Sequence, residues 1–238
     1  MKNLLQSVKN DIADFLMKQK KFFFNERDLQ MNLALYLSNL KDKRYEVQLE
    51  YHIPKSKLND YPWEEDNISI DLVVEKDGEY VPIELKYKTR SLSKELKIDR
   101  FGAPLTANAI IKNQSAQDLG RYGFWKDVKR IEQLTEEYEK VIGGIVVFVT
   151  NDESYTNNPK NSSVGYYDFR MISGEIIGNA GNMNSLAWRK DGIQYEPTKK
   201  SSCSFKLKNK YKVPEWGTYE SQTNFGSQKM FYNILLIK

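Results

Sequence analysis

Apolar residues recur at helical spacing in two stretches near the start of the chain. The first stretch predicts an amphipathic helix whose buried stripe is formed by Leu4, Leu5, Val8, Ile12, Phe15 and Leu16. The second predicts a helix that begins after Asn25, a favourable N-cap, and ends near Leu40. Its stripe continues through Leu29, Leu33 and Leu37, and Glu26 lies one turn upstream on the same line. We therefore expect this helix to direct a carboxylate inward, at the end of its apolar face.

Strand-like and helical patterns then follow one another up to residue 150. Three strands are expected, covering Tyr45–Ile53, Ile68–Glu75 and Glu79–Lys88. The turn signal Asp77-Gly78 joins the second and third of them in a hairpin. A long helix is expected from about Gln114 to Lys140, with an apolar side formed by Leu119, Tyr122, Trp125, Val128, Ile131, Leu134 and Tyr138. A buried strand should cover Val141–Thr150.

The composition changes after Asn151, where Asn, Ser, Gly and Lys become frequent. Residues Cys203–Val213 alternate between apolar and polar, and Met230–Ile237 is typical of a buried final strand. The whole order predicts an α/β fold with a mixed central sheet flanked by helices. Residues 1–150 would form the core, and residues 151–238 an irregular, β-rich C-terminal elaboration that completes the sheet within the same domain.

Composition narrows the chemistry that this chain can perform. The sequence has one histidine, His52, and one cysteine, Cys203, so zinc sites rich in these residues and His-activated nucleophiles are excluded. An intramolecular disulfide is excluded as well, which favours a cytoplasmic location. No apolar run is long enough to span a membrane, and we expect no membrane partner. The net charge of +4 is compatible with a polyanionic partner.

Carboxylates and a lysine gather on the two strands of the predicted hairpin. Alternation assigns Ser69, Asp71 and Val73 to one face of the earlier strand and Ile70, Leu72 and Val74 to the other. In the later strand Glu84, Lys86 and Lys88 share a face, opposite Ile83, Leu85 and Tyr87. Because a short turn joins the strands, Asp71 and Glu84 can converge and form a hard oxygen site for Mg²⁺ or Mn²⁺. Glu26 could complete this site directly or through water.

The pattern of Asp71 followed by Glu84-Leu85-Lys86 resembles that of the PD-(D/E)xK nuclease superfamily, which includes restriction endonucleases and Holliday-junction resolvases. Glu26-Arg27-Asp28-Leu29 is similar to the first motif of that family, whereas Ile70 stands where the motif has proline. The resemblance covers roughly residues 20–150. It implies a restriction-endonuclease-like core in which Glu26, Asp71, Glu84 and the Leu85 carbonyl hold the metal and Lys86 acts on the attacking water.

The resemblance also implies a function: Mg²⁺-dependent endonuclease-type hydrolysis of phosphodiester bonds in nucleic acid, more often DNA, in restriction, repair or defence. A homodimer is possible, since two strands need two sites. Substrate contacts would come from Lys88 and from the start of the long helix, where Gln117, Arg121 and Tyr122 lie. An ordinary helix with an exposed polar face is the alternative for those helix residues.

Three further alternatives remain open from the sequence. Asp28 competes with Glu26 as the inward acid, because the helix dipole favours any acidic residue in the first turn. The lysine ladder of Lys206, Lys208, Lys210 and Lys212 either contacts a phosphate backbone or protects an edge strand from aggregation, and we favour the second. The same fold could also serve as a catalytically silent nucleic-acid-binding module or as a protein-interaction module.

Overall fold

Six strands form the central sheet in the order β1-β2-β3-β6-β14-β13. The computed structural model describes residues 4–43, 45–58, 61–64, 67–93, 97–106, 111, 116–178, 185–223 and 226–238. In the chain order these strands are β1 (Glu46–Pro54), β2 (Asn67–Lys76), β3 (Glu79–Lys88), β6 (Gly144–Thr150), β13 (Gly217–Thr223) and β14 (Gly226–Ile237). Only β3 and β6 run parallel to each other within this sheet, so the sheet is mixed as expected.

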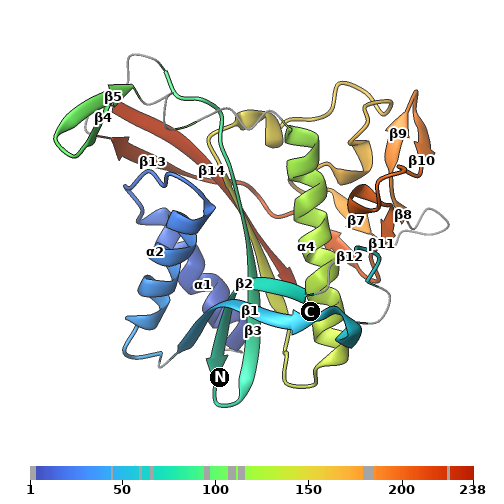
Figure 1. Ribbon diagram of the computed structural model, residues 1–238, viewed down its shortest axis with the longest axis horizontal. Helices are drawn as coiled ribbons and strands as arrows, with labels where there is room; N and C mark the ends of the chain where they lie inside the picture. The colour runs from blue at the N-terminus through green and yellow to red at the C-terminus, as the bar shows by residue number, and fades with distance from the viewer. Residues whose placement is uncertain are drawn as a thin grey trace.

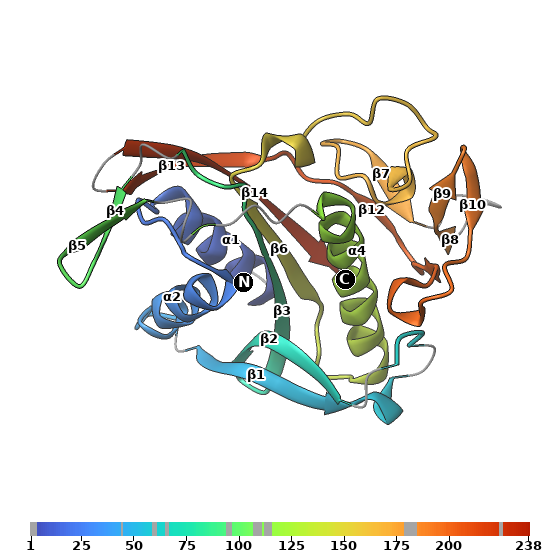
Figure 2. The same ribbon diagram turned by 45° about the horizontal axis from the view of Figure 1, so that its top comes forward.

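Three described α-helices cover the two faces of the sheet. Helices α1 (Leu4–Met17) and α2 (Glu26–Ser38) lie on one face, and α4 (Gln117–Glu137) lies on the other (Figures 1 and 2). Each apolar stripe is buried against the strands: Leu5, Val8 and Ile12 of α1 are at most 1% exposed. Burying such side chains contributes about 1.5–3 kcal/mol each, which is why the predicted stripes locate the helices well.

The start of α2 is fixed by the cap that the sequence predicts. The Asn25 side chain accepts a hydrogen bond from the backbone N–H of Asp28 at 2.8 Å. In return the Asp28 carboxylate accepts one from the backbone N–H of Phe24 at 3.1 Å. Asp28 is therefore a capping residue, and Glu26 occupies the first turn of α2 with its side chain directed to β3. Of the two acids, Glu26 is the one turned inward.

The β2–β3 hairpin has the expected two-residue turn but does not pair along its full length. Asp77 and Gly78 both have positive φ, at 54° and 80°, which suits the right-handed twist of the flanking strands. Pairing runs from Lys76 opposite Glu79 to Leu72 opposite Ile83 and stops there. On its other side β3 pairs with β6 from Ile83 to Lys88. Among the described residues, the second half of β3 therefore has a strand on one side only.

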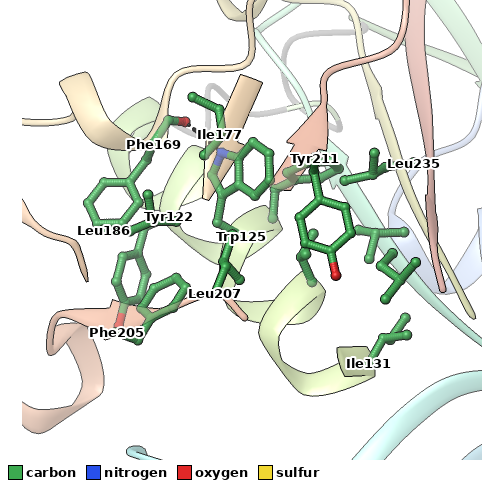
Figure 3. Packing of buried hydrophobic residues seen from close by; sticks show 14 of the residues in the cluster. Tyr122, Trp125, Ile131, Phe169, Ile177, Leu186, Phe205, Leu207, Tyr211 and Leu235 are labelled. Atoms are coloured by element: carbon green, nitrogen blue, oxygen red, sulfur yellow. Dashed lines mark hydrogen bonds between the residues drawn. The ribbon is translucent and has the colours of Figure 1, made fainter. Parts of the chain in front are cut away.

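The C-terminal elaboration packs against the outer side of α4. Its short strands are β7 (Ile176–Gly178), β8 (Ser185–Leu186), β9 (Trp188–Lys190), β10 (Ile193–Tyr195), β11 (Phe205–Lys206) and β12 (Lys210–Lys212). Aromatic rings join it to the helix: Tyr122 stacks on Trp188, and the Trp125 indole donates a hydrogen bond to the carbonyl of Phe169 at 3.1 Å (Figure 3). The buried Glu132 carboxylate accepts from the backbone N–H groups of residues 208 and 209.

Several boundaries differ from the sequence-based expectation. Residues Cys203–Val213 alternate in burial only in part, because residues 208–210 are all exposed, and they form two short strands instead of one. The patterns did not predict β13, the 3-10 turns or the hairpin of β4 (Lys97–Arg100) and β5 (Ala103–Thr106). Leu119, assigned to the apolar side of the long helix, is 52% exposed, and the proposed start at Gln114 lies outside the described residues. Within the described chain, no helix is both long enough and apolar enough to cross a membrane.

Candidate functional site

Two carboxylates occupy the place where β2 leaves β3. The Asp71 carboxylate accepts a hydrogen bond from the backbone N–H of Leu85 at 2.6 Å. The Glu26 carboxylate accepts one from the backbone N–H of Tyr87 at 2.8 Å. These two N–H groups belong to the unpaired edge of β3, and buried backbone donors require a partner. Acidic side chains from α2 and β2 thus satisfy donors that a continuous sheet would pair with a neighbouring strand.

The predicted alternation of side chains along β2 is wrong on one side of Asp71. Leu72 and Val74 face the core under α1 and α2, but Ile70 packs with Val73 in the core under α4. The change of face coincides with an irregularity in β1, where Leu49 pairs with Leu72 and Tyr51 with Ile70. Between these pairs, Glu50 has a positive φ of 50°. This irregularity interrupts the regular pleat next to Asp71.

Helix α2 holds this irregular region in place through a second set of hydrogen bonds. The buried Gln30 amide donates to the Asp71 carbonyl at 2.7 Å and to the Glu50 carboxylate at 2.9 Å. Glu50 also accepts from the Ser69 hydroxyl at 2.7 Å and forms an ion pair with Arg27 at 2.6 Å. Asp71 is therefore positioned by its own backbone as well as by its side chain.

Glu84 and Lys86 project from one face of β3, as the alternation predicts, and both contact α4. Glu84 is 1% exposed, and its carboxylate lies 2.5 Å from the Arg130 guanidinium. The Lys86 ammonium lies 2.6 Å from the Asp127 carboxylate, which is itself 3.5 Å from Arg130. The four side chains form a chain of alternating charge between the sheet and the helix.

Sequence reasoning did not identify Asp127 and Arg130 as part of this site. A signal was present, because Asp127 lies between Phe124 and Ile131 at helical spacing on the buried side of α4. A charged residue on an apolar helix face requires a partner, and Lys86 is that partner. The contacts of Asp127 and Arg130 with β3 could not be predicted from the sequence, because they depend on how α4 crosses the sheet.

Burial and crowding of charge shift the pKa of the central groups. Burial raises the pKa of Asp71 to about 6, against the opposing effects of Lys86 and of the Leu85 N–H. Burial also raises the pKa of Glu84, which the nearby Arg130 opposes and the carboxylates of Asp127 and Asp71 reinforce. For Lys86, burial lowers the pKa, but the surrounding Asp127, Glu26, Glu84 and Asp71 outweigh it and raise the pKa. Lys86 is therefore a firmly protonated cation.

The residues at this position fit a hard divalent cation. With all groups ionised, four carboxylates (Glu26, Asp71, Glu84 and Asp127) surround two cations, Lys86 and Arg130, which leaves an excess of negative charge. Among the described residues no three acidic, His or Cys side chains form a ready-made metal cluster. Mg²⁺, however, commonly takes only one or two carboxylates and fills its shell with water and phosphate. Asp71, Glu84 and the Leu85 carbonyl, which accepts a hydrogen bond from the Lys86 ammonium at 3.1 Å, are the groups that could hold such an ion.

The residues expected to contact substrate are not brought together at this site. Arg121 is 2% exposed, lies over the rings of Tyr155 and Tyr166, and donates to the carbonyl of Ser154 at 2.6 Å. Tyr122 is 4% exposed and accepts from the Trp63 indole. The structure corrects the prediction for both, because their side chains are buried within the protein.

Gln117 and Lys88 remain at the surface and are only partly covered. The Gln117 amide donates to the carboxylate of Asp152, which ties the start of α4 to the end of β6. Lys88 lies two residues after Lys86 on the same strand, β3, and its side chain is half-buried. No hydrogen bond or ion pair of the Lys88 side chain is found among the described residues, whereas the Gln117 amide is engaged by Asp152.

Comparisons with protein-family models, with curated proteins and with solved structures found no match. The chain is therefore described by its own architecture: an α/β protein with a mixed central sheet. Its distinguishing feature is a set of ionisable side chains at the junction of β2, β3 and α4.

Proposed function

We propose that this protein is a Mg²⁺-dependent nuclease of the endonuclease type, acting through Asp71, Glu84 and Lys86. The observation that carries the proposal is the placement of the Asp71 carboxylate, bonded to the Leu85 N–H at 2.6 Å, beside Glu84 and Lys86 on the adjoining strand. The charges of Asp71, Glu84 and Lys86 influence one another, which supports a common role for the three side chains. The PD-(D/E)xK-like order of the residues supports the same conclusion.

Each side chain has a definable role in this reaction. When bound, the metal ion would neutralise charge on the phosphate and lower the pKa of its water ligand. Asp71 and Glu84 would hold that ion, in competition with the Arg130 guanidinium that contacts Glu84. Lys86, protonated at neutral pH, stabilises negative charge that develops at phosphorus and orients the attacking water. Asp127 holds the Lys86 ammonium in position.

Glu26 has a supporting role in this proposal. Its carboxylate is already engaged by the Tyr87 N–H, which fixes the distance between α2 and the active strand. It contributes negative charge near Lys86 and could reach a metal ion through water. We propose DNA as the preferred substrate, with Mn²⁺ able to replace Mg²⁺, and a homodimer as the form that cuts both strands. Restriction, repair or defence in the cytoplasm would be the setting.

The test is cleavage of supercoiled, linear and branched DNA with and without Mg²⁺ or Mn²⁺. The informative variant is Asp71→Asn, because the amide keeps an acceptor for the Leu85 N–H while it removes the charge that would hold the metal. We expect metal-dependent nicking by the wild type, none by Asp71→Asn, and full activity in Lys206→Ala, a surface control. Equal cleavage by the wild type and Asp71→Asn would overturn the proposal.

A second candidate function is binding of nucleic acid without cleavage. The observation that favours it is the contact of Arg130 with Glu84, which already supplies the carboxylate with a cation. If this contact persists in the presence of Mg²⁺ and DNA, Glu84 cannot serve as a metal ligand. Salt-sensitive DNA binding that is unaffected by metal, together with no cleavage, would establish this alternative.

A further inference from the structure

A groove of about 470 Å³ lies between β12 and β14, away from the residues assigned to the nuclease site. It is lined by consecutive residues of both strands, Lys210 to Lys212 of β12 and Ile234 to Leu236 of β14. Consecutive residues point to alternate faces of a strand, so a groove that meets all of them runs along the strand edges. The rest of the lining is formed by Lys9 of α1, Asn209, Pro214 and Lys238.

Both strand edges lack a partner in the described chain. Strand β14 pairs with β13 only as far as Tyr232, opposite Gly217, and residues 233–237 pair with β6 alone. Strand β12 pairs on one side with β7. An unpaired edge offers a row of backbone N–H and C=O groups, which is the template for adding another strand. The groove is thus bordered by two such templates.

The groove is strongly positive. Four lysines line it, namely Lys9, Lys210, Lys212 and Lys238, and no acidic side chain is among the described residues of its lining. Lys210 and Lys212 are exposed and alternate with the buried Tyr211. Lys208, the preceding lysine of the ladder, differs because it forms an ion pair with Glu136 at 2.8 Å. The groove therefore gathers four lysines with no acidic side chain in its described lining.

We propose that this groove binds an extended, acidic segment of a partner protein, which adds a strand to the free edge of β14. Alternate side chains of an acidic strand would form ion pairs with the lysines of the groove. The side chains between them would pack against Tyr211, Ile234 and Leu235, the apolar floor of the groove. Backbone hydrogen bonds would supply affinity and the charges would supply selectivity. A phosphate backbone would use the lysines but neither the strand edges nor the apolar floor.

This proposal is independent of the proposed nuclease activity, and its probe is a synthetic peptide. Fluorescence anisotropy would compare three peptides of eight residues: alternating Glu and Val, alternating Lys and Val, and the acidic peptide with two central residues replaced by proline. We expect binding by the first alone, because proline removes backbone donors that strand addition needs. Comparable binding by the proline peptide would overturn strand addition, since charge alone would then explain the affinity.

The protein variants use three positions of the lysine ladder, two inside the groove and one outside it. The pair Lys210→Glu and Lys212→Glu should weaken binding by about tenfold or more, whereas Lys206→Glu, an exposed lysine outside the groove, should leave it unchanged. Hydrogen exchange should slow for backbone amides of residues 234–238 when the acidic peptide is present. The proposal would be refuted if the acidic peptide fails to bind. It would also be refuted if the double substitution weakens binding of a DNA oligonucleotide and leaves binding of the peptide unchanged.

Discussion

The Asp71 carboxylate accepts a hydrogen bond from the backbone N–H of Leu85 at 2.6 Å, just beyond the point where β2 stops pairing with β3. A side chain here substitutes for a strand. The same hydrogen bond favours the charged form of Asp71, while burial disfavours it more strongly. The protein therefore holds a carboxylate where its charge is costly, which is characteristic of functional positions.

Asp71→Asn should stabilise the protein at neutral pH. The folded pKa of Asp71 is raised to about 6, above its ordinary value of 3.8, so the unfolded chain ionises first as the pH rises. Stability consequently falls between about pH 4 and pH 6 and stays lower above that range. The variant should gain about 1–3 kcal/mol in free energy of unfolding at pH 7.5.

Urea denaturation of the wild type and of Asp71→Asn at several pH values would measure this gain. The difference in free energy of unfolding should shrink as the pH falls below about 4, where Asp71 is protonated in both states. A difference that stays constant from pH 3.5 to pH 7.5 would show that ionisation of Asp71 is not its cause.

Mg²⁺ should raise the melting temperature of the wild type, because an ion that binds only the folded state stabilises it. At about ten times the dissociation constant, the gain would be about 1.4 kcal/mol. Asp71→Asn should lose most of this response, which thermal denaturation with MgCl₂ against KCl of equal ionic strength would detect. An equal shift in both proteins would place the bound ion elsewhere.

Lys86→Met should destabilise the protein, since it leaves the Asp127 carboxylate, 2% exposed, without its nearest cation. Removing one member of a buried pair costs about 3–5 kcal/mol. Adding Asp127→Asn should recover part of this loss, so the two substitutions should be non-additive in a double-mutant cycle measured by denaturation. Additive effects would contradict a direct pairing between the two side chains.

Arg130→Met should cost stability in a pH-dependent manner. Without Arg130, the buried Glu84 has a still higher folded pKa, because the largest effect that lowers it is gone. The variant's deficit should be nearly constant below about pH 8, where Glu84 is protonated in both folded proteins, and should grow as the pH rises from about 8 to about 10, where Glu84 ionises in the wild type alone. Urea midpoints across this range would test it. A deficit that is independent of pH would point to lost packing instead.

Much of the fold was predictable from the sequence because single elements carry their own signals. The leucines of α2, the turn at Asp77-Gly78 and the apolar run of β6 each define an element locally. Strand β13 was missed because Gly217–Thr223 is mostly polar: its burial alternates, but of the buried positions Tyr219 and Ser221, one is a serine. The change of face at Ile70 was missed because it depends on Glu50 in the neighbouring strand.

The candidate site was predictable only in part, for the same reason. Asp71, Glu84 and Lys86 are linked by one hairpin, so spacing and alternation were enough to place them near one another. Arg130 and Asp127 arrive from a helix more than forty positions further along the chain, and no local pattern connects them to β3. Arg121 and Tyr122 were misassigned because the elaboration that buries them contains no recognisable motif.

The pairing of β6 with β14 has a consequence for how the chain acquires its structure. On the side away from β3, residues 144–150 find their partners in residues 231–237, so the interior of the sheet stays open on that side until the final strand docks. Contacts of such large sequence separation slow folding. During synthesis, an apolar strand of seven buried residues would wait for the whole elaboration to emerge from the ribosome. Dependence on a chaperone during this interval is the expected price of completing the sheet last.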